Sequence, residues 1–108
     1  MKPMNAISAL ARRLALAGNV TRLSVLCTLM RKRSACVSEI AEETHESIAT
    51  VSHHLRILAG EGLVVPLREG KRVCYALSRD PFASDLKRLA CKYAEAATRS
   101  EHYSITMK

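Results

Sequence analysis

The sequence contains no tryptophan and only four aromatic residues among 108, which are Tyr75, Phe82, Tyr93 and Tyr103. Proteins that bind unpaired RNA or DNA stack bases on several aromatic side chains, so this class is disfavoured. Acidic residues are also absent from the first 36 positions, which carry seven basic side chains. The formal charge of +7 on the whole chain favours a polyanionic partner, and the shortage of aromatic residues favours double-stranded DNA.

Long apolar segments are missing as well. No uncharged run approaches the roughly 18 residues that a membrane span requires. Arg12 and Arg13 interrupt the only apolar stretch near the N-terminus, which argues against a secretory signal. Because the four cysteines are widely spaced and no secretory segment precedes them, we expect reduced thiols rather than a structural disulfide. These features predict a cytoplasmic protein without a membrane partner.

A catalytic site is not expected either. The sequence contains no glycine-rich phosphate-binding loop. Its histidines fall in a predicted turn, on one predicted helix and in the C-terminal tail, so no cysteine–histidine pair in a cleft is indicated. We therefore expect a binding protein and not an enzyme.

Apolar residues recur with the 3.6-residue period of a helix in five segments. We expect these helices at about residues 5–17, 21–33, 38–44, 48–60 and 81–100. Ser38 and Ser47 are placed to cap the third and fourth helices. The predicted inward stripe of the fourth helix consists of Ile48, Val51, Leu55 and Leu58, and that of the last helix consists of Phe82, Leu86, Leu89 and Tyr93.

After Gly62 the apolar period changes from 3.6 to 2, which predicts a β-hairpin with a basic tip at about residues 63–78. The chain is thus expected to be mainly α with a small β-hairpin, in the order α-α-α-α-β-β-α, and to form one domain over residues 1–108. Two short helices followed by such a hairpin are typical of a winged helix-turn-helix. The helix-turn-helix would span about residues 38–61, and the hairpin would be the wing.

The second helix of such a pair fits the major groove of DNA, and the wing carries cations to neighbouring phosphates or the minor groove. On this basis, the predicted DNA-contacting residues are Ser47, Thr50, Ser52, His53, Arg56, Arg68, Lys71 and Arg72. The alternative is that they form only the solvated face of an amphipathic helix and a charged turn. Their order along the chain favours DNA.

The segment around the third helix is acidic, with Glu39, Glu42, Glu43 and Glu46. This charge argues against DNA contact along the third helix, so we expect the duplex to meet the start of the fourth helix and the wing. The affinity of one copy would then be modest, which favours a dimer that spans two half-sites.

Three segments of the sequence together resemble the ArsR/SmtB family of bacterial winged-helix repressors. They are Val-Ser-His-His-Leu-Arg-Ile-Leu at 51–58, Gly-Leu-Val at 62–64 and Arg-Glu-Gly-Lys-Arg-Val-Cys-Tyr at 68–75. Residues 19–23 are similar to the opening of that family's second helix, and the likeness covers roughly residues 5–95. The resemblance implies a homodimer that binds an imperfect palindromic operator and is released when an inducer acts far from the DNA.

The resemblance also implies that the dimer is built on the first and last helices, at about residues 5–17 and 81–100. The first helix is rich in alanine, and Ala90, Ala94 and Ala97 form a small-residue stripe on the last helix. Both faces can pack closely against a second copy. The alternative is that they cover the core of a single chain.

The metal sites of the family are matched only in part. Its arsenic and cadmium sensors carry Cys-Val-Cys at the start of the third helix, where this chain has Cys36-Val37-Ser38. Its zinc sensors carry Asp-x-His on the last helix, where this chain has Asp80-Pro81-Phe82. We therefore expect no resident metal or cofactor, and a repressor that responds to arsenite, cadmium or zinc is the alternative function.

The persulfide- and redox-sensing branch of the family carries one cysteine on the second helix and one near the end of the last. Cys27 and Cys91 match these positions, which implies that reactive sulfur or an oxidant modifies both thiols and releases DNA. The alternative for Cys27 is a small apolar core residue. Cys36 is either a reactive thiol at a helix start or an inert boundary residue, and Cys74 is interpreted as strand packing.

Overall fold

A computed structural model describes residues 3–99, with side chains over residues 5–94. Ala97, which belongs to the predicted small-residue stripe, therefore lies outside the described side chains. The described residues form five helices and three strands in the order α1 (Pro3–Ala17), α2 (Val20–Lys32), β1 (Ser34–Cys36), α3 (Val37–Thr44), α4 (Ile48–Gly60), β2 (Val64–Glu69), β3 (Arg72–Leu77) and α5 (Pro81–Arg99). Within residues 3–99, no helix combines the length and the apolar character that a bilayer crossing requires.

The predicted order of elements is confirmed, with one addition. The hairpin of β2 and β3 is joined by a third antiparallel strand, β1, so the sheet order is β1-β3-β2. Sequence analysis missed β1 because three residues are too few to show the alternation of a strand. The short strand aligns Ser34 with Ala76 and Cys36 with Cys74, and thereby joins the start of α3 to the base of the wing.

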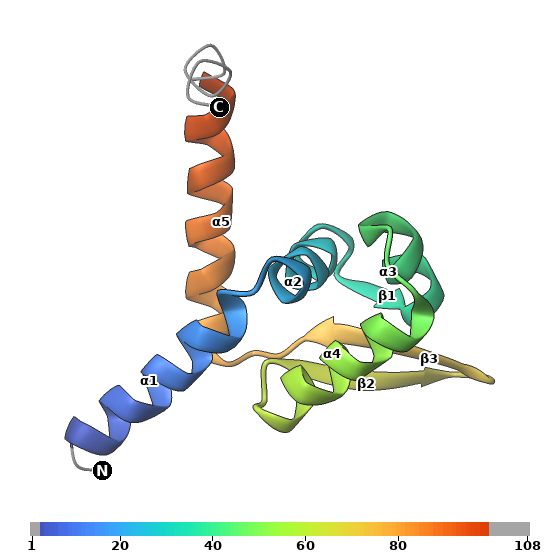
Figure 1. The fold of residues 1–108 in the computed structure, drawn as a ribbon, viewed down its shortest axis with the longest axis horizontal. Coiled ribbons are helices and arrows are strands. Elements are labelled where there is room, and N and C mark those ends of the chain that lie inside the picture. Colours follow the sequence, from blue (N-terminus) through green and yellow to red (C-terminus); the bar gives the residue numbers. More distant parts are fainter. Residues whose placement is uncertain (1–2, 100–108) are drawn as a thin grey trace.

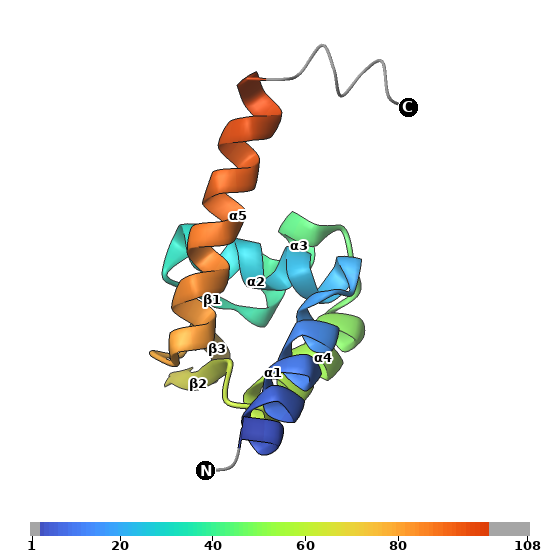
Figure 2. The ribbon, with the colours of Figure 1, turned by 90° about the vertical axis from the view of Figure 1, so that its left-hand side faces the viewer.

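The core lies between α2, α3, α4 and the inner side of the sheet. Its completely or almost completely buried apolar side chains are Val25, Leu26, Leu29, Ile40, Val51, Leu55, Leu58, Leu63 and Val64. In Figures 1 and 2, α1 and α5 extend away from this body in different directions, and the wing projects from it at the end of the sheet. The fold therefore separates the helix-turn-helix and the wing from most of α1 and α5.

Local hydrogen bonds explain where α3 and α4 begin. Ser47 caps α4 as predicted, because its Oγ accepts a hydrogen bond from the backbone nitrogen of Thr50 at 3.0 Å. The predicted cap at Ser38 is wrong, since β1 runs directly into α3 and makes Cys36 the N-cap. There the Glu39 carboxylate accepts a hydrogen bond from the backbone nitrogen of Cys36 at 2.8 Å.

Two predicted apolar stripes are only partly buried. On α4, Val51, Leu55 and Leu58 are buried as predicted, but Ile48 is 57% exposed because it lies in the first turn, ahead of the core contact. On α5, Phe82 and Leu86 pack against the core, whereas Leu89 and Tyr93 are exposed. Ile7, Leu10 and Leu14 on α1 are exposed as well. These exposed faces do not cover the core of the single chain.

Truncation of Leu55 tests the core contact of α4. Because Leu55 has 0% exposure, the Leu55→Ala variant is expected to lose about 3 kcal/mol of free energy of unfolding in urea denaturation. Ile48→Ala, a matched truncation on the same helix, should lose less than about 1 kcal/mol because Ile48 is largely exposed. Equal losses in the two variants would contradict the described orientation of α4.

Candidate nucleic-acid interface and thiol sites

The turn between α3 and α4 presents the start of α4 to solvent. His45 ends α3 in the left-handed conformation, with φ of 57°. The backbone nitrogen of Glu46 then donates a hydrogen bond to the carbonyl oxygen of Ala41 at 3.0 Å, and the Thr21 hydroxyl donates to the Glu46 carboxylate at 3.5 Å. The acidic side chain of the turn is thereby directed toward α2.

The predicted DNA-contacting residues of α4 lie on the side opposite its buried stripe. Ser47, His53 and Arg56 are exposed, and Thr50 and Ser52 are half-buried. The Ser47 hydroxyl donates to Oγ1 of Thr50 at 2.9 Å. Because Oγ1 of Thr50 accepts this bond, the hydroxyl proton of Thr50 is left to donate to another acceptor.

His54 was not singled out by sequence analysis, although its spacing from Val51 and Leu58 marks it as a neighbour of the buried stripe. The Arg22 guanidinium donates to Nδ1 of His54 at 3.4 Å and to the carbonyl oxygen of Leu16 at 2.7 Å. Burial lowers the pKa of His54; the positive charges of Arg22 and His53 lower it further, and Glu46 opposes them. A neutral His54 thus joins α4 to α2.

The wing places two cations at its tip. Glu69 ends β2 and Arg72 begins β3, so Gly70 and Lys71 form the turn, where Gly70 adopts a φ of 64° that favours glycine. Arg68 and Lys71 are exposed there. The tip therefore offers two exposed positive charges, and the next residues along β3, Arg72 and Val73, lie near the start of α4.

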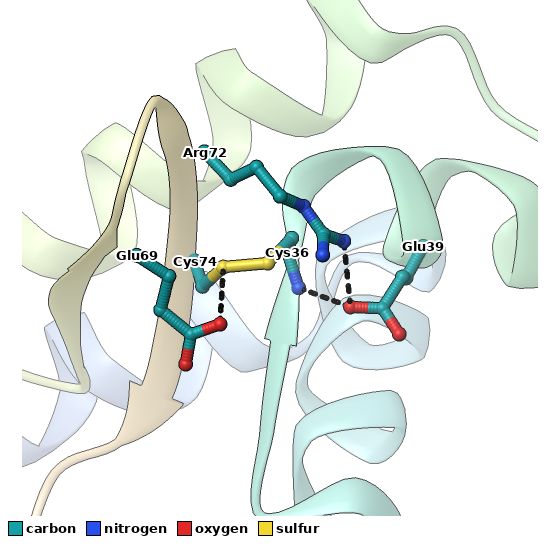
Figure 3. The surroundings of a disulfide bond; sticks show 5 residues. All are labelled: Cys36, Glu39, Glu69, Arg72 and Cys74. Atoms are coloured by element: carbon teal, nitrogen blue, oxygen red, sulfur yellow. Dashed lines mark hydrogen bonds and ion pairs between the residues drawn. A yellow bond between two sulfur atoms is a disulfide. The ribbon is translucent and has the colours of Figure 1, made fainter.

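Arg72 is oriented differently from the two cations of the tip. Its Nη2 lies 3.6 Å from Oε1 of Glu39, so the guanidinium points from the wing toward α3, as Figure 3 shows. Glu43 is also paired: hydrogen bonds from Arg31 and Lys32 lower the pKa of its carboxyl group. Ion pairs thus offset much of the acidity that we expected to keep DNA away from α3.

A cavity of about 290 Å³ separates the start of α4 from the part of the wing next to its turn. Its lining includes Cys36 and Ser38 from the start of α3, Ile48 and Ser52 from α4, and Arg72 and Val73 from β3. Cys36 therefore borders the same surface that carries the predicted DNA contacts.

Cys36 and Cys74 form a disulfide bond, contrary to the prediction of reduced, separate thiols. The two cysteines are 38 residues apart in the sequence, and the unpredicted strand β1 aligns them as direct partners across the sheet. Oε1 of Glu69 lies 3.9 Å from the Cys74 sulfur (Figure 3). The two sulfurs and the Glu69 carboxylate all lie within 4.8 Å of one another.

Cys27 and Cys91 are the free cysteines of the described residues, and they differ in exposure. Cys91 is exposed on α5, whereas Cys27 on α2 is half-buried and opens onto an apolar groove of about 480 Å³. This groove is lined by Leu23 on α2 and by Leu86, Leu89, Ala90 and Tyr93 on α5. Burial raises the pKa of the Cys27 thiol, the positive charge of Arg31 opposes this effect, and the negative charge of Cys91 adds to it.

The buried position of His54 predicts a pH-dependent stability. Its pKa lies below the ordinary value of 6.5 in the folded protein, so the unfolded chain binds the proton more readily. The free energy of unfolding should therefore fall as the pH drops through 6.5 and below, and His54→Gln should flatten this slope in urea denaturation. His53→Gln, at the exposed neighbouring position, should flatten the slope less, because the charge of His53 is a smaller cause of the lowered pKa than burial. A His54→Gln profile as steep as the parent profile would contradict this assignment.

Comparison with known proteins agrees with this architecture. The sequence profile described as "Bacterial regulatory protein, arsR family" matches residues 19–65, from the cap of α2 into β2. A cadmium resistance transcriptional regulatory protein CadC homolog from Staphylococcus aureus is 39% identical over 57 residues, which cover 53% of this chain and 47% of the relative. The chain spans about half the length of the curated relatives it matches.

Solved structures share the fold over more of the chain. Reduced HlyU from Vibrio cholerae N16961 is 26% identical, with a TM-score of 0.76 over 83% of this chain and 93% of that one. The homodimeric winged helix-turn-helix DNA-binding domain of a possible ArsR-family transcriptional regulator from Mycobacterium bovis is 27% identical, with a TM-score of 0.73 over 94% of each chain. The chain thus resembles the arsR family of bacterial regulatory proteins over residues 19–65, and it shares the winged-helix fold of these solved structures over most of its length.

Proposed function

We propose that this chain is a transcriptional repressor that binds double-stranded DNA as a homodimer. The observation that carries the proposal is the solvent-facing side of α4, whose first residues share a cavity with Arg72 and Val73 next to the basic turn of the wing. A helix of this kind fits the major groove, and a neighbouring hairpin reaches the flanking phosphates or the minor groove. The net charge of +7 favours this encounter through long-range attraction.

The proposed contacts divide into two groups. His53 and Arg56 are exposed on α4 and carry donors long enough to reach base edges. The Thr50 hydroxyl, whose oxygen already accepts from Ser47, is free to donate to a phosphate at the start of the helix. At the wing, Arg68 and Lys71 supply the phosphate contacts, whereas Arg72 shares its charge with Glu39 and contributes less.

The exposed apolar faces of α1 and α5 support the homodimer. Leu10 and Leu14 on α1, and Leu89 and Tyr93 on α5, are large apolar side chains that the single chain leaves exposed, and Tyr93 reaches 74%. A second copy would remove these side chains from water and would pair two α4 helices about a two-fold axis. Such symmetry matches a palindromic operator. The related domain from Mycobacterium bovis is homodimeric.

Removal of the wing cations tests DNA binding. The Arg68→Ala/Lys71→Ala variant should bind a duplex more weakly, and the slope of log K against log salt should become shallower by about 0.9 for each phosphate that is no longer neutralised. Arg72→Ala is the comparison, and it should change both quantities less, because Arg72 shares its charge with Glu39. Fluorescence anisotropy over a salt series measures both quantities. An unchanged slope in the double variant would instead favour a winged-helix module that binds an acidic protein.

We further propose that Cys27 and Cys91 are the sensor thiols. Cys91 is exposed and can react first, whereas the Cys27 thiol is half-buried at the α2–α5 groove and feels the charge of Cys91. The Cys91 thiolate attacks a polysulfide, and a shorter polysulfide leaves with the bonding electrons. The Cys27 thiolate then attacks the inner sulfur of the Cys91 persulfide and expels hydrosulfide, which leaves a Cys27–Cys91 disulfide. This bond would change how α5 meets α2, and hence the spacing of two α4 helices in a dimer.

The sensor proposal predicts ordered, pH-dependent chemistry. Polysulfide should modify Cys91 first. Formation of the Cys27–Cys91 bond should accelerate as the pH rises toward and beyond 9.0, the ordinary thiol value, because burial raises the pKa of Cys27. Intact-mass spectrometry and DNA release are measured in parallel, and Cys27→Ser and Cys91→Ser should each retain DNA. Release of DNA while both thiols stay unmodified would contradict the assignment.

The alternative function is a repressor that responds to arsenite, cadmium or zinc. It is favoured by the CadC homolog and by the proximity of the Cys36, Cys74 and Glu69 donor atoms. After reduction of the disulfide, these donors would supply three of the four ligands that zinc prefers. Cadmium-dependent release of DNA that survives Cys27→Ser and is lost in Cys36→Ser, in reducing buffer, would favour this alternative.

A further inference from the structure

We propose that Cys36 and Cys74 form a second thiol–disulfide exchange site, distinct from Cys27 and Cys91. Its co-reactants are low-molecular-weight disulfides and thiols of the glutathione class. The oxidised pair strengthens the contact of α4 and the wing with DNA, and this effect on DNA rests on the proposed function. The sign is opposite to that of the Cys27–Cys91 bond, which would release DNA.

The Cys36–Cys74 disulfide joins two parts of the fold that are far apart in the sequence. The 38-residue separation between the two cysteines encloses α3, α4, β2 and the turn of the wing. Within the sheet, the other connection between the start of α3 and β3 is strand β1, which directly precedes α3 and pairs with β3 at three positions. The disulfide is therefore a covalent connection between the helix-turn-helix and the wing, as Figure 3 shows.

The two cysteines of the disulfide differ in their position relative to the cavity. The residues are 4% and 1% exposed, yet Cys36 lines the cavity between α4 and the wing and Cys74 does not. We infer that a small thiol or disulfide enters by this cavity and meets Cys36 before Cys74. Arg72, which is paired with Glu39, also lines this cavity.

The exchange reaction balances without a further oxidant. In oxidation, the Cys36 thiolate attacks one sulfur of the external disulfide, and an external thiolate leaves with the bonding electrons. The Cys74 thiolate then attacks the Cys36 sulfur and expels the second external thiolate. The two protein thiols are oxidised to one disulfide, the external disulfide is reduced to two thiols, and the released protons pass to those thiolates or to water. Reduction follows the same steps in reverse, with attack at the reachable Cys36 sulfur.

The neighbouring charges support this order of attack. Glu69 places a carboxylate oxygen 3.9 Å from the Cys74 sulfur, and this negative charge disfavours a thiolate there. Cys36 is the N-cap of α3, where the backbone dipoles favour negative charge, and the carboxylate nearest to it, that of Glu39, is paired with Arg72. The reachable cysteine is thus also the better initial nucleophile.

The same cavity connects the bond to DNA binding. Ile48 and Ser52 of α4 lie across the cavity from Arg72 and Val73 of β3. The disulfide therefore holds the wing at a fixed distance from α4. A surface held in its bound arrangement loses less freedom when DNA binds. When the Cys36–Cys74 disulfide is reduced, the three pairs between β1 and β3 remain to hold the wing near α4. The looser arrangement is expected to bind DNA more weakly.

The test uses the full chain carrying Cys27→Ser and Cys91→Ser. It is equilibrated in a series of glutathione redox buffers and analysed by alkylation and intact-mass spectrometry. The Cys36–Cys74 bond should form and open reversibly. The reduced form should bind a mixed-sequence duplex on the order of fivefold more weakly than the oxidised form, as a loss of preorganisation predicts. The matched control carries Cys36→Ser and Cys74→Ser as well, and its affinity should not vary between buffers.

Two results would overturn the proposal. One is a bond that neither opens nor forms across the buffer series, and the other is equal DNA affinity of the two forms. If no duplex binds in either state, the proposed function fails, but hydrogen exchange still tests the site. Faster exchange at the amides of Arg72–Leu77 after reduction supports the exchange site, and unchanged exchange overturns it.

Discussion

The burial of one face of α4 is the constraint on which the rest of the molecule depends. Val51, Leu55 and Leu58 have 0% exposure, and they pack into a core that α2, α3 and the sheet share. This packing fixes the rotation of α4 about its axis. His53 and Arg56 are consequently turned to solvent, on the side from which the wing also projects. The contact of His54 with Arg22 adds a polar connection between α4 and α2 at the edge of the same interface.

The cysteines divide into two pairs that act on different parts of the fold. Cys27 and Cys91 lie where α5 meets α2, close to the apolar surfaces that a second copy would cover. Cys36 and Cys74 lie where the wing meets α3, beneath the cavity next to the recognition helix. One pair lies on α2 and α5, whose exposed apolar side chains a second copy would cover, and the other joins β1 to β3 near the start of α4. Together, the two proposals would make one chain responsive to two sulfur signals.

Sequence patterns predicted the features that depend on neighbouring residues. The helical periods, the Ser47 cap and the basic turn of the wing are local properties, and each is present in the structure. Strand β1 and the Cys36–Cys74 bond depend on a pairing across 38 residues, which no local pattern reveals. Ile48 fits the apolar period of α4 but lies beyond the end of the core contact. The Arg72–Glu39 ion pair likewise arises only because β1 brings the wing beside α3.

The central claim is that the outer face of α4 and the wing together form the DNA-binding surface. The most direct measurement is a backbone amide NMR titration of the full chain with a double-stranded oligonucleotide at low salt. The account predicts chemical-shift changes concentrated at residues 47–56 and 68–72, with the largest changes at the start of α4 and at the tip of the wing. Shift changes confined to α1 and α5, or no change at any amide, would contradict it.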